Sequence, residues 1–286
     1  MIKSQSAMEY LMTYGWAILI IAVVLAALFE LGVFNPMTFA PKASPGSCQV
    51  VRPEGAGTTN FISLEGECNG ELPQYAAQFN GQSNYIAANI DNLPVGTQSR
   101  TMVLWVNLAN TNYQTVAGYG STSCYESFDI FTDCSGSNYL SVDGWCTCED
   151  LPPPISAGTW YFVAEEYNGT DQIGYLGDDG QLYKISAAWT YNTVSSPFYI
   201  GKQYGSEAYL AGEIANVQLY NSSLSSSEIQ ALYREGIGGA PIKIQDLIAW
   251  WPLNGNADDY SGNSNNGVPT SGVSYTTNWY SGYSAP

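Results

Sequence analysis

The chain has 286 residues, with 8 lysines and arginines against 25 aspartates and glutamates, so its net charge is −17, and it contains no histidine. So few basic residues cannot neutralise a phosphate backbone, and we therefore expect no nucleic-acid partner. The lack of histidine excludes Ser-His-Asp triads, Cys-His dyads and histidine-ligated zinc. Aromatic residues make up 14 % of the chain, which supplies enough apolar surface for a folded body over most of its length.

An uncharged apolar segment covers residues 11–29. A helix of this length, at about 1.5 Å per residue, suits a hydrocarbon core of about 30 Å. Asn35-Pro36 ends the helix, because the residue before a proline avoids the helical region. We therefore predict a hydrophobic transmembrane or assembly helix over residues 5–35. Lys3 favours a cytoplasmic N-terminus, which predicts a single-pass protein of the cell membrane with its C-terminal bulk outside the cell.

The run QSAMEY at residues 5–10, directly before the apolar segment, resembles the class III signal peptide of archaeal type IV pilin-like proteins. This resemblance implies that a prepilin-type signal peptidase removes residues 1–4 by cutting between Ser4 and Gln5. Glu9 would then neutralise the new amino group of Gln5 on a neighbouring pilin-like subunit, a head-to-tail contact that builds open filaments. The alternative is that Glu9 marks the membrane interface of a single-pass anchor that does not polymerise.

Six cysteines follow the apolar segment and none precedes it: Cys48, Cys68, Cys124, Cys134, Cys146 and Cys148. An even number in an exported body indicates three disulfides. The first two flank a short β segment, and we expect them to pair with each other. A bond between the last two would strain the backbone, so the third and fourth cysteines each pair with one of them, and both connectivities stay open. Zinc is the rival interpretation, but the chain offers neither histidine nor a Cys-x-x-Cys pair.

Two further features concern the exported body. The sequons at Asn168 and Asn221 are candidate glycosylation sites, which gain weight because the body is exported. With few cations and no histidine, protonation of the carboxylates leaves only a small positive charge, and we therefore expect the fold to tolerate acid.

Most of the body is typical of short β-strands, because β-branched and aromatic residues alternate with polar ones between turn-forming clusters. The strands we predict cover residues 101–107, 159–164, 172–176, 197–201 and 212–220. Glu165-Glu166 follows the second of them, and we expect this pair at an exposed strand end. One helix is predicted after the last strand, since Ser225 and Glu228 form a capping box and Gly236 supplies a stop.

Five motifs in chain order resemble the laminin-G-like, concanavalin A-like jelly roll. They are Phe79-Asn80-Gly81 with Tyr85-Ile86, then Trp105, then Gly158-Thr159-Trp160, then Tyr199-Ile200-Gly201, and finally Gly212 to Tyr220 leading into the helix. The resemblance spans residues 76–236. It implies an antiparallel β-sandwich that serves adhesion or the recognition of carbohydrate on surfaces.

The C-terminal region carries a motif that often opens domains of this family, an apolar strand followed by Trp251-Pro252 and a polar loop that ends at Gly267. The segment is too short for a second sandwich. We predict a circular permutation, in which C-terminal strands within residues 237–286 complete the sandwich. The alternative is a truncated second repeat.

These inferences divide the chain into five parts. They are a leader (1–4), a hydrophobic helix (5–35), a linker with the Cys48/Cys68 β segment (36–75), a laminin-G-like jelly roll (76–236) and the completing strands (237–286).

Ligand binding is indicated at one loop. Asp258, Asp259 and Asn263 place several oxygens close together, as Ca²⁺ requires, and the resemblance to jelly rolls that hold Ca²⁺ supports a calcium site there. The alternative is a polar turn. We expect no catalytic residue, because the carboxylates between Glu126 and Asp133 lack the Glu-x-Asp-x-x-Glu signature of the sandwich glucanases.

The sequence as a whole therefore predicts a mainly β, pilin-like surface protein that is anchored in the membrane or forms filaments. Its laminin-G-like domain would serve adhesion or carbohydrate recognition. The alternative is a single-pass lectin-like adhesin that does not polymerise, and a minor alternative is a glycan-active enzyme on the same fold.

Overall fold

The computed structural model describes residues 18–25, 72–135, 138–205, 208–270 and 272–286. Residues 18–25 are helical and belong to one compact unit, and residues 72–286 belong to another. Within the described part of the chain, no helix has both the length and the apolar character needed to cross a bilayer. The predicted cleavage site Ser4-Gln5, together with Glu9, Cys48 and Cys68, lies outside the described residues.

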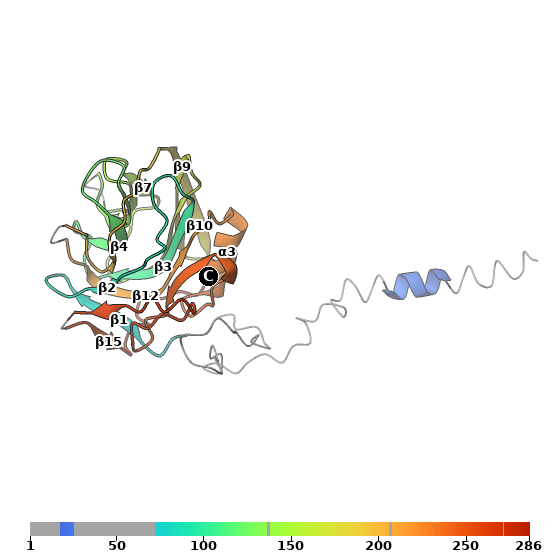
Figure 1. Cartoon of the computed structure of the whole chain (residues 1–286). Coiled ribbons are helices and arrows are strands. Elements are labelled where there is room, and N and C mark those ends of the chain that lie inside the picture. Colours follow the sequence, from blue (N-terminus) through green and yellow to red (C-terminus); the bar gives the residue numbers. More distant parts are fainter. Residues whose placement is uncertain (1–17, 26–71, 136–137, 206–207, 271) are drawn as a thin grey trace, which may run out of the picture. The chain divides into compact units, whose positions relative to one another are not determined.

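Two antiparallel sheets, called sheet A and sheet B here, form the body (Figure 1). Sheet A runs in the order β10 (Gln181–Ala188), β9 (Asp171–Asp178), β8 (Trp160–Tyr167), β3 (Arg100–Leu108), β12 (Ala211–Tyr220), β1 (Ala76–Asn80) and β15 (Ser274–Thr276), with β13 (Leu247–Trp251) also paired to β12. Sheet B runs in the order β14 (Val268–Pro269), β2 (Ile86–Ala88), β11 (Phe198–Ile200), β4 (Thr115–Gly120), β5 (Ser127–Thr132), β6 (Leu140–Asp143) and β7 (Glu149–Leu151). The predicted antiparallel β-sandwich is thus confirmed.

Strand β3 shows why the five predicted strands form where they do. Met102 and Leu104 face sheet B, whereas Val103 and Trp105 face the opposite side of sheet A, where they are covered as well. Because both faces are buried, the strand reads as a nearly continuous apolar run. The other four predicted strands correspond to β8, β9, β11 and β12.

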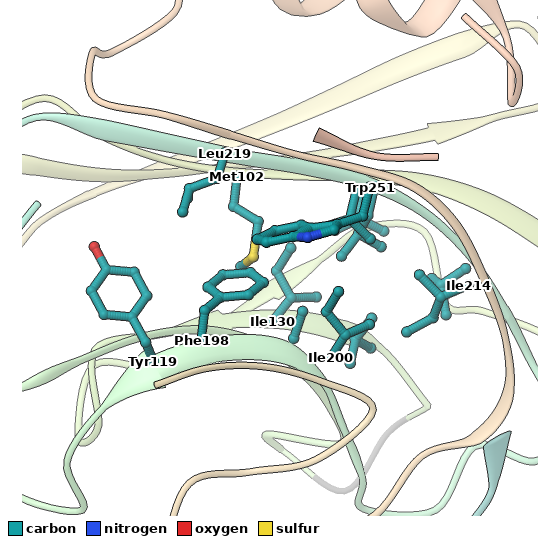
Figure 2. Close-up of a cluster of buried hydrophobic side chains, with 14 of the residues drawn as sticks. Met102, Tyr119, Ile130, Phe198, Ile200, Ile214, Leu219 and Trp251 are labelled. Carbon is teal, nitrogen blue, oxygen red and sulfur yellow. The ribbon is translucent and has the colours of Figure 1, made fainter. Parts of the chain in front are cut away.

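The main core lies between the two sheets, where Met102, Phe198 and Trp251 meet (Figure 2). The rings of Phe198 and Trp251 stack, with centroids 5.2 Å apart. Phe198 belongs to sheet B and Trp251 to β13, so a C-terminal strand contributes directly to the interlayer packing.

Helix α3 (Ser226–Glu235) covers part of the outer face of sheet A. The predicted capping box is confirmed, because the Ser225 side chain accepts a hydrogen bond from the Glu228 backbone and the Glu228 side chain accepts one from the Ser225 N–H. The Tyr233 ring on the buried side of the helix stacks on Trp105, with centroids 5.9 Å apart. A short 3₁₀ turn, η1 (Ile244–Asp246), then leads into β13.

The C-terminal strands pair with the last long strand of the body and with its first two strands. β13 pairs with β12, β14 with β2 and β15 with β1, all antiparallel. The segment after residue 246 therefore extends both sheets. The origin of this arrangement in a circular permutation stays a prediction.

Two disulfides fasten one edge of sheet B. Cys124 bonds to Cys146, with the Cα atoms 5.1 Å apart, and Cys134 bonds to Cys148, with the Cα atoms 6.1 Å apart. Of the two connectivities that the sequence left open, the structure has this one. The bonds tie the loops that connect β4, β5, β6 and β7.

Candidate functional site

A cavity of about 430 Å³ opens on the outer face of sheet A, beside the part that α3 covers. Its polar lining consists of Gln78, Asn80, Asn84, Asn107, Glu213, Ser274, Asn278 and Ser281. The volume falls in the range of about 300–1,000 Å³ that is usual for small-ligand sites. We call this cavity the sheet-A pocket.

The floor of the sheet-A pocket is a row of side chains from four neighbouring strands. Ser274 on β15 lies opposite Gln78 on β1, Gln78 lies opposite Glu213 on β12, and Glu213 lies opposite Asn107 on β3. Side chains alternate between the faces of a strand. The apolar neighbours Phe79 and Ile214 therefore point into the core, and the polar row points outward.

The C-terminal segment forms one wall of the pocket because it packs very closely against the residues at the start of β8. The Trp160 N–H donates to the Gly282 carbonyl oxygen at 2.9 Å, and any Cβ at Gly282 would collide with the Gly158 carbonyl oxygen. This close approach holds the Ser281 carbonyl where it accepts a hydrogen bond from the Asn107 amide at 3.3 Å.

Two asparagines of the opposite wall are fixed by their own hydrogen bonds. Asn84 accepts from the Asn80 N–H at 2.8 Å and donates to the Gly272 carbonyl oxygen at 2.6 Å. Asn80 in turn accepts from the backbone N–H groups of Gln82 and Ser83. The wall is therefore ordered before any ligand arrives, which lowers the entropy cost of binding.

Glu213 is the single charged side chain in the pocket lining. Its carboxylate makes neither a hydrogen bond nor an ion pair with any residue that the structure describes, and burial raises its pKa above the ordinary glutamate value. A half-buried carboxylate without a partner is costly. Such a group facing a cavity is a functional-site candidate on physical grounds.

Two carboxyl groups, those of Asp129 and Asp143, lie side by side on the outer face of sheet B. Gly118, Asp129 and Asp143 occupy directly opposite positions on β4, β5 and β6. Tyr204 covers this row and donates a hydrogen bond to Asp129 at 3.0 Å. Burial first, and the neighbouring Asp143 second, raise the pKa of Asp129 well above its ordinary value.

The predicted exposed pair Glu165-Glu166 is instead buried, so that expectation is wrong. Glu165 points between the sheets, where it accepts hydrogen bonds from Gln172 and Tyr191, and burial raises its pKa strongly. Glu166 points to the other face, where it accepts from Tyr175 at 3.0 Å. Strand β8 continues past its predicted end because Gln172 and Tyr175 of the neighbouring strand β9, together with Tyr191, supply polar partners for these carboxyls.

The comparisons with known proteins agree with this architecture. The family model described as the concanavalin A-like lectin/glucanases superfamily matches residues 80–230, which is just over half of the chain. The chain belongs to this superfamily. No curated protein sequence matches the chain significantly.

Solved structures resemble this concanavalin A-like domain in fold. A candidate carbohydrate-binding protein from Bacteroides ovatus superposes with a TM-score of 0.55 at 18 % identity, over 71 % of this chain and 60 % of that one. The heptameric SAP-like pentraxin from Limulus polyphemus gives a TM-score of 0.51 at 13 % identity, over 71 % of this chain and 94 % of that one. The matched region therefore spans less than two thirds of the Bacteroides protein.

In this concanavalin A-like domain, the residues of the predicted calcium site lie in the loop that follows β13. The buried Asp259 accepts hydrogen bonds from the N–H groups of Trp250, Ser261 and Asn265, and Asn263 donates to the carbonyl oxygens at the start of β13. Asp258 is exposed. These contacts hold β13 in place, and calcium binding at this loop stays a prediction. In the described part of the chain, no group of three or more acidic, cysteine or histidine side chains gathers as a metal site.

The two predicted glycosylation sequons lie at the surface. Asn168 is exposed in the turn between β8 and β9, where its side chain accepts from the Thr170 N–H at 2.9 Å, and Asn221 is exposed directly after β12. The polar row of the sheet-A pocket was not predicted from the sequence. Its one sequence signal is that the polar residues Gln78, Asn107 and Glu213 stand next to apolar strand residues, at positions that face away from the core.

Proposed function

We propose that this domain recognises carbohydrate and that the sheet-A pocket is its binding site. The observation that carries the proposal is the row of amide and hydroxyl side chains around one unpaired carboxylate, inside a cavity of about 430 Å³. Sugars present many hydroxyl groups, and amides and carboxylates supply matching donors and acceptors. Membership of a superfamily of lectins and glucanases, and the fold of the Bacteroides candidate carbohydrate-binding protein, support the proposal by analogy.

The pocket chemistry favours binding over hydrolysis, the minor alternative. Glycoside hydrolysis generally uses two carboxyl groups on opposite sides of the scissile bond. Among the described residues that line the pocket, Glu213 is the one carboxylate. Asp129 and Asp143 do form a pair, but Asp129 is fully buried beneath Tyr204. We therefore propose a recognition module rather than an enzyme.

We further propose that the N-terminal region displays this module at the cell surface. In residues 18–25 all of the large apolar side chains are exposed within the chain, from Leu25 at 48 % to Ile18 at 65 %. A helix that is apolar all round requires a bilayer or other helices as its cover. This supports a helix that is anchored in a membrane or packed in a filament. We propose the pilin-like form of it, with cleavage before Gln5, and the non-polymerising adhesin remains its alternative.

Each part of the proposal has its own experiment. A glycan array probed with the full-length protein and with a double variant, Gln78→Ala and Asn107→Ala, tests the pocket, and Gln181→Ala on the exposed edge strand β10 is the matched control. We expect the double variant alone to lose binding.

N-terminal sequencing of the native protein tests the proposed display at the cell surface. Gln5 as the first residue supports processing, and Met1 contradicts it. Electron microscopy of sheared surface material distinguishes filaments from a membrane anchor.

A further inference from the structure

We propose that Glu213 makes the sheet-A pocket selective for hydroxyl-rich ligands that carry a free amine, such as amino sugars, and against acidic sugars. This inference rests on the proposed function. It goes beyond it by naming the chemical class of the ligand and the residue that determines it.

The Glu213 carboxylate is isolated from other charges in the pocket lining. Its cross-strand neighbours Gln78 and Asn107 are neutral, and neutral residues make up the rest of the pocket lining. Directly opposite residues on neighbouring strands have Cβ atoms about 5 Å apart. The carboxylate is therefore held among amides, which can hydrogen-bond to a ligand but cannot neutralise the charge.

The isolated charge of Glu213 is costly to the folded protein. The Glu213 carboxylate is half-buried without a partner, and burial alone raises its pKa. A ligand ammonium group would supply the missing opposite charge and a charge-assisted hydrogen bond, which is stronger than a neutral one. An acetylated amine offers an N–H without the charge. A uronate brings a second carboxylate, which repels the first.

The electrostatic field of the whole chain also favours cationic ligands. With a net charge of −17, the protein repels anions and attracts cations from solution. The long-range field and the pocket carboxylate therefore favour the same class of ligand. Salt weakens the long-range part, but it weakens the contact at a half-buried carboxylate less.

The test compares three ligands of matched length by calorimetry on the full-length protein in detergent. They are oligomers of glucosamine, of N-acetylglucosamine and of glucuronic acid, at about pH 6, where a free amine is protonated and an ordinary carboxyl is ionised. We expect the glucosamine oligomer to bind about tenfold or more tightly than its acetylated form. Glu213→Gln should remove this preference and keep the binding of the acetylated oligomer.

The control variant is Asp91→Asn, which removes one negative charge from an exposed residue that does not line the pocket and should keep the preference. A second measurement needs no variant: acidification through the Glu213 pKa should weaken only the glucosamine oligomer. Equal affinities for all three ligands, or a preference that survives Glu213→Gln, would overturn the selectivity and leave recognition standing. The absence of binding to any of the three would count against the inference and the proposed function together.

Discussion

The indole of Trp251 stacks on the phenyl ring of Phe198, with centroids 5.2 Å apart and planes inclined by 17° (Figure 2). Trp251 lies on β13 near the C-terminus, and Phe198 lies on β11 of the opposite sheet. Both side chains are fully buried. This one contact shows that the C-terminal segment is part of the domain core.

Truncation of this side chain should destabilise the whole sandwich. We expect Trp251→Ala to lower the free energy of unfolding by about 3–5 kcal/mol, because it removes a large buried ring and leaves a cavity. Val268→Ala, at a residue that is 66 % exposed, is the matched control and should change little. Urea unfolding of the three proteins gives the comparison. A Trp251→Ala protein as stable as the control would contradict the packing described here.

The two disulfides should contribute unequally to stability. Their sequence separations are 22 residues for Cys124–Cys146 and 14 residues for Cys134–Cys148. On the chain-entropy model each contributes about 3 kcal/mol, slightly more for the longer loop. Double serine variants of each pair should therefore melt below the native protein, with the 124/146 pair lower. Peptide mapping without reduction checks the pairing itself, and a peptide linking Cys124 to Cys148 would contradict it.

The buried Asp129 predicts a pH dependence of stability. Its pKa is raised in the folded state, so the folded protein binds this proton more tightly than the unfolded chain does. The stabilisation is complete below the unfolded pKa and is lost as the pH rises through the folded pKa. This carboxyl alone therefore makes the fold less stable at neutral pH than in acid.

Asp129→Asn removes this titration and should reduce the loss of stability between about pH 4 and pH 7. Urea midpoints across this range measure the effect. The partly exposed Glu228 has a lowered pKa and acts in the opposite direction, so the difference between Asp129→Asn and the native protein is the informative quantity. A pH profile identical in the two proteins would show that the Asp129 pKa is not raised.

The cap of α3 gives a local prediction. Ser225→Ala should cost about 1 kcal/mol, because the Glu228 N–H loses its side-chain acceptor. Ser227→Ala, in the first turn of the same exposed helix end, is the control. If both variants had the same melting temperature, the Ser225 side chain would not be the stabilising cap.

The sequence predicts those features that depend on local pattern. The strands around Leu104 and Ile214 follow from runs of β-branched and aromatic residues between turn-forming clusters, and the cap at Ser225 follows from hydrogen bonds within four residues. The burial of Glu165 could not be predicted in this way, because its partner Tyr191 comes from a distant segment. The choice between two disulfide connectivities likewise depends on how the β4–β7 loops fold together.

The sheet-A pocket illustrates the same limit. Gln78, Asn107, Glu213 and Ser274 come together only through the register of four strands, and no local pattern encodes that register. The loop at Asp259 shows the converse case. Its residues suit a cation in composition, and Asp259 also accepts four hydrogen bonds from nearby groups and holds β13, so calcium binding there stays a prediction.

The most direct test of the central claim is a nuclear magnetic resonance titration of the full-length protein with an oligosaccharide that the glycan array identifies, following side-chain amide signals. The account predicts that the Gln78 and Asn107 amide signals shift in a saturable manner, while the signal of Gln181 on the exposed edge strand does not. Saturable shifts confined to residues outside the sheet-A pocket would contradict it.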